Sequence, residues 1–437
     1  MSTRTVGRRL AAPLRKPFQA RAQARTALAA RAMSSSASSP AGRLRSTPKV
    51  STLFTVLMAV GIASTAYGVY QFYTTFTMWP PEVRADLRAG IKAKHQGDFD
   101  LSARYLKRAW ETAQTLPLAA FASEPHLKLS GIAVVLAEAF EGSNRPQEAY
   151  DVYSAALAQL QAAKNLSGRE RMRAVAIAHK LGEMAEIYQR GPEETEQWLT
   201  YAVEEMLRVV KSESNASKGK VVSAEEPDGE VGAMLGELDL PWWVRKVDVA
   251  APLEALGRFY AQEGKNEYAV TLYLQAIGML MQPEPNQKNA SVEDRCRGAQ
   301  LMNNLSDLMV HGPPPTNLKF AENWARQAQS VIEKTRTLPG AQKDPENMAL
   351  CEQTLAAVLF NLGALLEASF CGRTVQMGGK YDAAMKSFQD SLDQAKRIGM
   401  RSGAMEARSA IRRIERTQKA AASANSVQDD KATAAAQ

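Results

Sequence analysis

A recurring spacing of small and large residues constrains this chain more than any other feature of its sequence. Six positions between residues 256 and 276 are separated by steps of 3, 4, 5, 4 and 3: Gly257, Tyr260, Gly264, Ala269, Tyr273 and Ala276. The same steps separate Gly90, Ala93, Gly97, Ser102, Leu106 and Ala109, and again Ala137, Phe140, Asn144, Ala149, Tyr153 and Ala156. Small residues at such positions let two antiparallel helices cross closely, and the large residues fill the space beside the crossing. The spacing therefore predicts helical hairpins of one repeated type.

Three looser copies extend the array. They begin around Gly182, Leu305 and Gly363, the last two with insertions. Gly264 falls where a first helix should end in a left-handed residue, as it does in the tetratricopeptide pattern. Stacked hairpins of this kind bury a continuous core that no single pair could build. The expected fold is all-α: a tetratricopeptide-repeat α-solenoid of about six hairpins, preceded by one transmembrane helix. An unrelated helical bundle is the alternative, and the regular spacing disfavours it.

The first 48 residues differ in composition from the rest. Residues 1–49 hold 11 of the 54 Lys and Arg residues and no acid, which leaves 43 basic and 46 acidic residues beyond them. Arg on one helical face with Leu, Phe and Ala on another is the composition of a mitochondrial transit peptide, and Arg31 before Met33 resembles a matrix-processing site. A basic tail on some other membrane is the alternative. The slightly acidic remainder gives no electrostatic reason to bind nucleic acid.

An uncharged stretch follows the leader. No charged residue lies between Lys49 and Glu82. A helix over residues 51–73 would span about 34 Å at about 1.5 Å per residue, enough to cross a hydrocarbon core of ~30 Å. Because the positive flank is N-terminal, we expect the N-terminus in the mitochondrial matrix and the repeats in the intermembrane space. A buried core helix and a removed sorting signal are the alternatives.

The expected membrane helix carries small residues four apart. They form two pairs: Ala59 with Ala63, and Ser64 with Gly68. Such pairs let a partner helix approach closely, so these residues are candidates for packing inside the membrane. They are also common in membrane helices that have no partner.

The chain divides into six expected segments. These are a transit peptide and leader (1–48), the membrane helix (51–73), the first repeats (82–210), a flexible insertion loop (211–240), the second repeats with a cap helix (241–416) and a disordered tail (417–437). The insertion loop is expected because its sequence is polar and Gly-rich. Trp242 and Trp243 follow it. One of them is a candidate partner anchor while the other packs inward, or both pack as a staple across the interrupted array.

Residues on the first helix of the best hairpin are candidates for a client-binding groove. Glu254, Arg258 and Gln262 lie at i, i+4 and i+8, so one helical face presents all three. A purely solvated face is the alternative. Lys is absent from these positions, which argues against a carboxylate clamp.

No sequence motif indicates catalysis. The chain lacks a P-loop, an H-E-x-x-H zinc motif and a G-x-S-x-G elbow. We therefore expect a protein that is not an enzyme, without catalytic residues, cofactor or metal. The cysteines Cys296, Cys351 and Cys371 form no C-x-x-C pair, and the four His residues are scattered. We expect free thiols, although the sequence leaves open that one pair oxidises.

Two stretches carry a resemblance to a known family. They read "PWWVRKVDVAAPLEALGRFYAQEGKNEYAVTLYLQAI" and "MWPPEVRADLRAGIKAKHQGDFDLSARYLKRAWE". With the order of presequence, membrane helix and repeats, the chain over residues 50–415 resembles the fungal tetratricopeptide adaptor subunit of the mitochondrial inner-membrane i-AAA protease supercomplex. A tetratricopeptide protein that assists respiratory complex III has a similar layout.

The resemblance implies a function. An adaptor of this family binds unfolded or misassembled membrane proteins and delivers them to the ATP-dependent protease. The implied partners are the i-AAA protease, its other adaptor subunit, unfolded clients and inner-membrane lipid. The competing hypotheses are an assembly factor for a respiratory complex and, from a different class, a hydrolase with a non-standard site, which no residue constellation supports.

Overall fold

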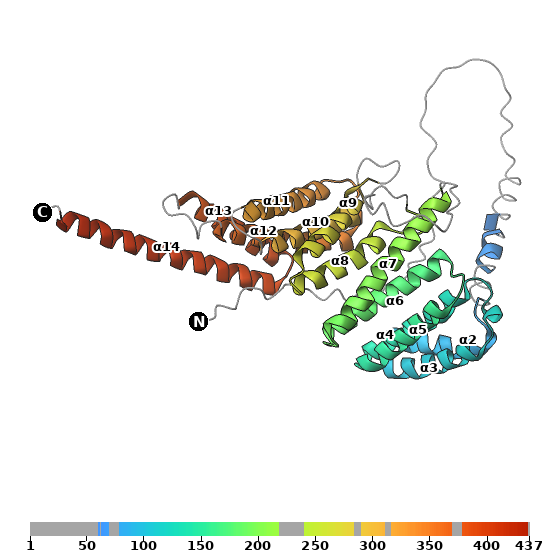
Figure 1. The fold of residues 1–437 in the computed structure, drawn as a ribbon. Helices are drawn as coiled ribbons and strands as arrows, with labels where there is room; N and C mark the ends of the chain where they lie inside the picture. The colour runs from blue at the N-terminus through green and yellow to red at the C-terminus, as the bar shows by residue number, and fades with distance from the viewer. Residues whose placement is uncertain are drawn as a thin grey trace, which may run out of the picture. The chain divides into compact units, whose positions relative to one another are not determined.

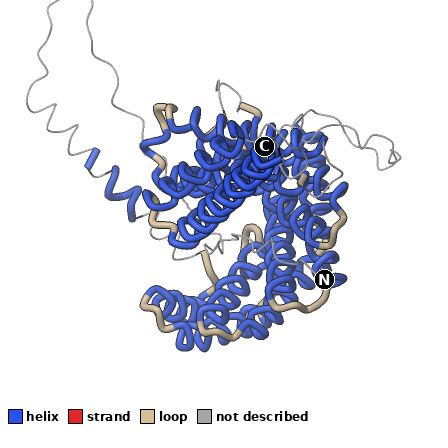
Figure 2. The backbone as a smooth tube through the Cα atoms, turned by 90° about the vertical axis from the view of Figure 1, so that its left-hand side faces the viewer, coloured by secondary structure: helices blue, strands red, loops and turns tan. Residues whose placement is uncertain are grey.

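The structure is a computed structural model that describes residues 60–61, 63–69, 78–217, 240–283, 290–310, 316–368 and 378–435. Within these ranges all regular elements are helices, and no strand is found (Figure 2). The chain divides into two compact units, residues 12–159 and residues 160–437 with 1–11. In the first unit the helices from Pro81 onward are α2 (Pro81–His95), α3 (Phe99–Thr115), η1 (Leu118–Phe121), α4 (Pro125–Gly142) and α5 (Pro146–Ala162), whose last residues pass the boundary.

The second unit holds the remaining hairpins (Figure 1). Its helices are α6 (Gly168–Ile187), α7 (Pro192–Ser217), α8 (Lys246–Gln262), α9 (Asn266–Met281), α10 (Val292–Met309), α11 (Thr316–Arg336), η3 (Ala341–Lys343), α12 (Pro345–Ala368), α13 (Gly378–Arg397) and α14 (Arg401–Ala435). Each even-numbered helix from α6 to α12 packs against the odd-numbered helix that follows it, and α14 packs on α13. Counting both units, the described chain contains six hairpins and a final helix, as the spacing predicts.

One type of turn closes the first helix of four hairpins. Its left-handed residue is Gly97 (φ 81°), Asn144 (φ 60°), Gln189 (φ 53°) or Gly264 (φ 76°). In each case the next backbone N–H donates to the carbonyl five residues earlier, as from Lys265 to Tyr260 at 2.8 Å. This 6→1 bond satisfies a carbonyl at the end of the helix and turns the chain back into the second helix. The left-handed conformation predicted for Gly264 is confirmed.

Glycines mark the points where the two helices of a hairpin cross. A Cβ added at Gly90 would lie 2.6 Å from Cγ of Leu106, and one at Gly257 would lie 2.8 Å from Cε1 of Tyr273. Both pairs belong to the repeated spacing. Hydroxyl groups add to the close contact, since Ser102 Oγ on α3 donates to the Gly90 carbonyl on α2 at 2.8 Å. The small positions therefore allow the backbones to approach, as the spacing predicts.

Two glycines of the fourth hairpin provide a test of this close packing. We expect Gly257→Ala to lower the free energy of unfolding by about 1–3 kcal/mol, because its Cβ would overlap the Tyr273 ring. Gly278, in α9, has no neighbour within 4 Å of an added Cβ. Gly278→Ala should therefore raise the free energy of unfolding by up to about 1 kcal/mol through helix propensity. Urea unfolding followed by circular dichroism measures both; a loss of stability from both variants, or from neither, would contradict the packing argument.

Two predicted boundaries differ from the structure. The insertion was expected to begin at residue 211, but α7 continues to Ser217. Residues 218–239 lie outside the described part. The tail was expected to be disordered from residue 417, but α14 continues to Ala435. Good helix formers, mainly Ala, fill much of this extension, and neither Pro nor Gly interrupts it.

The predicted membrane helix lies mostly outside the described residues, and Ala59 is among those not described. Residues 60–61 and 63–69 are helical and exposed, and Ala63, Ser64 and Gly68 fall among them. The hydroxyls of Ser64 and Thr65 both donate to the Gly61 carbonyl, at 3.0 and 2.8 Å, so each is satisfied within its own helix. A Cβ added at Gly68 would meet nothing within 4 Å.

Among the described helices, one is long and apolar enough to cross a membrane by length and composition, and it is α12. Half of its apolar window is buried. The helix packs against α10, α11 and α13, so its apolar character is that of a solenoid core. Membrane insertion of residues 51–73 stays a prediction.

Candidate partner-binding face

The three predicted groove residues lie on one face of α8 and reach the neighbouring hairpins. Arg258 Nη2 lies 3.1 Å from Glu186 Oε2, on α6. Gln262 Nε2 donates to the other carboxylate oxygen of Glu186 at 2.6 Å. Glu254 Oε2 lies 3.8 Å from Arg297 Nη1, on α10. These five residues, which we call the polar face, link the first helices of three consecutive hairpins.

The polar face is only partly exposed to solvent. The side chains of Arg258 and Glu186 are 35% and 25% exposed, and those of Arg297 and Glu254 are 24% and 14% exposed. Burial opposes the charged form of Arg258, but Glu186, Glu254 and Glu183 outweigh it and raise the pKa of the guanidinium. The arginine therefore stays charged within a net acidic group of neighbours. Nearby His179 on α6 has a pKa lowered mainly by burial, so its neutral form is favoured.

Two buried polar atoms on α8 and α10 have no hydrogen-bond partner among the described residues. They are Nε of Arg258, a donor, and Oε1 of Gln300 on α10, an acceptor. A buried polar atom without a partner costs about 1–3 kcal/mol. The described part of the solenoid thus leaves one donor on α8 and one acceptor on α10 unpaired. By contrast, Asn361 Nδ2 on α12 donates to Asn303 Oδ1 on α10 at 3.0 Å.

The two adjacent tryptophans have different environments. Trp243 is half-buried, and a Cβ added at Gly168 would lie 2.9 Å from its Cζ2, so the ring packs on the start of α6. Trp242 is 88% exposed. The Arg169 guanidinium carbon lies 5.7 Å from the Trp242 ring centroid, at the limit of a cation–π contact. The staple of two packed rings is therefore wrong, and Trp242 is the side chain available to a partner.

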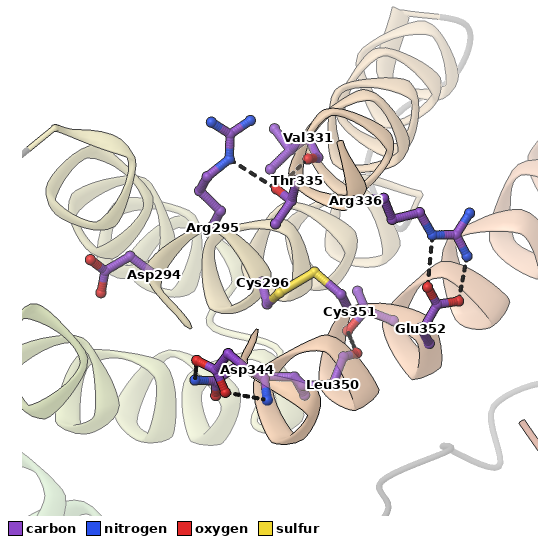
Figure 3. Close-up of a disulfide and its surroundings, with 12 residues drawn as sticks. Asp294, Arg295, Cys296, Val331, Thr335, Arg336, Asp344, Leu350, Cys351 and Glu352 are labelled. Atoms are coloured by element: carbon purple, nitrogen blue, oxygen red, sulfur yellow. Dashed lines mark hydrogen bonds and ion pairs between the residues drawn. A yellow bond between two sulfur atoms is a disulfide. The ribbon is translucent and has the colours of Figure 1, made fainter. Parts of the chain in front are cut away.

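A disulfide joins two neighbouring hairpins (Figure 3). It links Cys296 on α10 to Cys351 on α12, which are separated by 55 positions and have a Cα–Cα distance of 4.9 Å. Both side chains are fully buried. The expectation of free thiols is wrong for this pair, because stacking of the hairpins brings together two residues that no local motif relates. Cys371 lies outside the described residues.

A charged cluster flanks the disulfide (Figure 3). Glu352, next to Cys351, accepts from Arg336 Nε at 2.8 Å, Gln394 Nε2 at 2.6 Å and Arg397 Nη2 at 2.6 Å. Burial alone would raise the pKa of Glu352, but the hydrogen bonds from Arg336 and Gln394 and the charges of Arg336 and Arg397 hold it below its usual value. The carboxylate stays ionised and connects α11, α12 and α13. It belongs to the internal scaffold and is not a free binding group.

No metal site is evident in the described part of the chain, where no group of three or more His, Cys, Asp or Glu side chains could hold an ion.

Comparison with known proteins supports the repeat assignment locally. A family model described as "Tetratricopeptide repeat" matches residues 253–287, which contain α9 and most of α8. The fold is a tetratricopeptide-repeat α-solenoid. Solenoids of this type expose extended surfaces along the stacked repeats, and those surfaces bind other proteins.

Three solved structures illustrate what the chain is similar to. BtubC (BKLC) from P. vanneervenii is 20% identical, with a TM-score of 0.42, covering 69% of this chain and 90% of its own. The nuclear import adaptor Nro1 of S. pombe is 13% identical, with a TM-score of 0.38, covering 72% of this chain and 93% of its own. Yeast Tom70 is 12% identical, with a TM-score of 0.26, covering 79% of this chain and 67% of its own. No curated protein sequence matches the chain. Because these scores are low, the fold assignment rests on the hairpins themselves.

Proposed function

We propose that this protein is a non-enzymatic adaptor of the mitochondrial inner membrane. In this proposal the solenoid binds unfolded or misassembled client proteins and delivers them to the i-AAA protease. The protease and its other adaptor subunit are the stable partners, as the family resemblance of the sequence implies. Inner-membrane lipid surrounds the single helix at residues 51–73.

The polar face carries the client-binding part of the proposal. Its side chains are partly exposed, to 35% for Arg258 and 25% for Glu186. An extended polypeptide offers backbone carbonyls and N–H groups that pair with such side chains whatever its own side chains are. Recognition of the backbone suits a binder of unfolded proteins, whose sequences differ. The intramolecular pairs of Glu254, Arg258 and Gln262 make a charge-specific clamp a weaker explanation of the same face.

The disulfide supports the proposed side of the membrane. Disulfides persist in oxidising compartments and are rare where glutathione and thioredoxin keep thiols reduced. The bond between Cys296 and Cys351 therefore favours a location for the repeats outside the matrix and the cytosol. The intermembrane space meets this condition and agrees with the orientation expected from the basic leader.

The decisive test is affinity purification of the full chain from mitochondria in mild detergent, followed by mass spectrometry. We expect the i-AAA protease to be the main co-purifying protein. Trp242→Ala should lower its recovery severalfold, because this exposed ring is the proposed anchor. Phe320→Ala is the matched control, because Phe320 is also an exposed aromatic residue, at 56%. Recovery of a respiratory complex without the protease would replace the proposal with an assembly-factor function.

A further inference from the structure

The exposed face of α14 carries a row of cations. Arg401, Arg408, Arg412, Arg416 and Lys419 are all exposed, and we call them the basic stripe. At about 100° per residue they lie within roughly a quarter of the helix circumference, and they extend over about 27 Å. Met405 lies in the same row and is 68% exposed. The opposite face holds Ala407, Ala410 and Ile414, which are buried in the solenoid.

The cations of the basic stripe form no ion pair with any described residue. Elsewhere in the described chain, exposed arginines often pair within their own helix, as Arg208 does with Glu204 on α7 and Arg326 with Glu322 on α11. Even Arg413, on the flank of α14, is held by Glu367 of α12. Within the stripe, Arg408, Arg412 and Arg416 follow one another at i+4, while the exposed Glu415 lies four residues before Lys419. Like charges at this spacing destabilise a helix, so fold stability does not explain the arrangement.

Outside the stripe, residues 50–437 are net acidic. Beyond residue 49 the sequence carries 43 basic and 46 acidic residues, so the stripe concentrates five positive charges on a slightly acidic body. An anionic surface would therefore attract α14 more strongly than most of the remaining surface. The residues of the stripe are themselves exposed, so the neighbouring helices of the unit leave this face of α14 uncovered.

We propose that the basic stripe binds the headgroups of anionic phospholipids at a membrane surface. Guanidinium groups form paired hydrogen bonds with phosphate oxygens, and Met405 adds an apolar side chain at the interface. The stripe runs straight along the outer face of α14, so all of its cations can meet a flat membrane surface at the same time. Met405, Arg408, Arg412 and Arg416 line an open hollow of about 610 Å³ on this face. Every residue that lines it belongs to α14, so no other described helix forms a wall that would enclose a peptide, and a lipid surface is the better fit. The proposal concerns α14 alone and does not depend on the protease partnership.

Photo-crosslinking of the full chain, reconstituted into vesicles, tests this proposal. The vesicles contain phosphatidylcholine with or without phosphatidylglycerol, and a photoreactive form of each lipid is the probe. We expect peptides from residues 401–419 to crosslink to phosphatidylglycerol, with a yield that falls as salt rises. Mapping the crosslinked peptides by mass spectrometry separates this contact from any made by the basic leader.

The matched variants remove equal charge from two places. R408Q/R412Q/R416Q should lower partitioning of α14 to the anionic surface by about 100-fold, since each cation contributes about a fivefold factor. Gln is a good helix former, so α14 should persist, and circular dichroism checks this. The control K92Q/R104Q/K107Q removes exposed cations of α2 and α3 and should leave the α14 crosslinks unchanged. Equal crosslinking to both lipids, equal effects of both variants, or crosslinks from α14 to an acidic mitochondrial protein in place of lipid would overturn the proposal.

Discussion

Replacing both Cys296 and Cys351 with alanine should lower the free energy of unfolding of the last two hairpins by about 4 kcal/mol. The bond closes a loop between residues 55 positions apart, and loss of that constraint raises the conformational entropy of the unfolded chain by an amount of this order. The cost is large compared with the 5–15 kcal/mol that stabilises a typical domain. Because repeat arrays can unfold in parts, hydrogen exchange at the amides of α10 and α12 is the appropriate measurement.

Chemical reduction provides the control for the disulfide prediction. A reductant should increase hydrogen exchange in α10 and α12 of the wild-type protein and leave the alanine variant unchanged. The hairpins α6–α7 and α8–α9 should be affected less, since they contact the bond only through their neighbours. Exchange rates that are the same in the oxidised wild type and in the variant would show that the bond does not stabilise this part of the array.

Phe388→Ala should destabilise the end of the solenoid by about 3–5 kcal/mol, the usual cost of removing a buried phenyl ring. Phe388 on α13 is fully buried and covers Gly363 on α12, where an added Cβ would lie 2.8 Å from the ring. Its ring meets Phe360 edge-on at a centroid distance of 5.3 Å. It also packs with Ala410 and Ile414 of α14, so the cavity would loosen the final helix as well as the hairpin.

A matched control separates burial from aromatic character. Phe320→Ala removes a ring that is 56% exposed and should change the free energy of unfolding by less than about 0.5 kcal/mol. In the double variant Gly363→Ala/Phe388→Leu, the leucine leaves room for the new methyl group on α12, which fills part of the space of the lost ring. This variant should therefore lose less stability than Phe388→Ala. Thermal unfolding followed by circular dichroism compares all three. Similar midpoints for the Phe388→Ala and Phe320→Ala variants would refute the role assigned to the buried ring.

Local features of the chain were predictable from the sequence. The hairpins follow from steps of 3 to 5 residues, because helix crossings depend on side chains only a turn or two apart. Gly97 and Gly264 mark left-handed turns for the same reason, since glycine adopts positive φ without strain. Gln189 occupies the equivalent turn of the third hairpin at φ 53°, which its residue type does not suggest.

Contacts between hairpins were not predictable in the same way. Glu186 pairs with Arg258 across 72 positions, and the disulfide spans 55. Such pairs depend on how far one hairpin is shifted and rotated against the next, and residue spacing within a hairpin holds no information on that shift. The sequence therefore identified Glu254, Arg258 and Gln262 as one helical face. It did not identify Glu186 and Arg297 as the residues that pair with them. The separation of Trp242 from Trp243 has a similar origin, because it depends on the start of α6 lying beside Trp243.

The disulfide also affects how this protein would respond to a machine that pulls polypeptides through a narrow pore. An unfoldase draws in one extended strand, and each hairpin in its path can be peeled off in turn. At Cys296 or Cys351 the strand is covalently joined to a second one, so a loop of 55 residues must enter as a double strand or the bond must first be reduced. Traction from the C-terminus meets this obstacle at Cys351, after α14, α13 and most of α12 have been removed. A scaffold that works beside such a machine would thus resist being consumed by it while it stays oxidised.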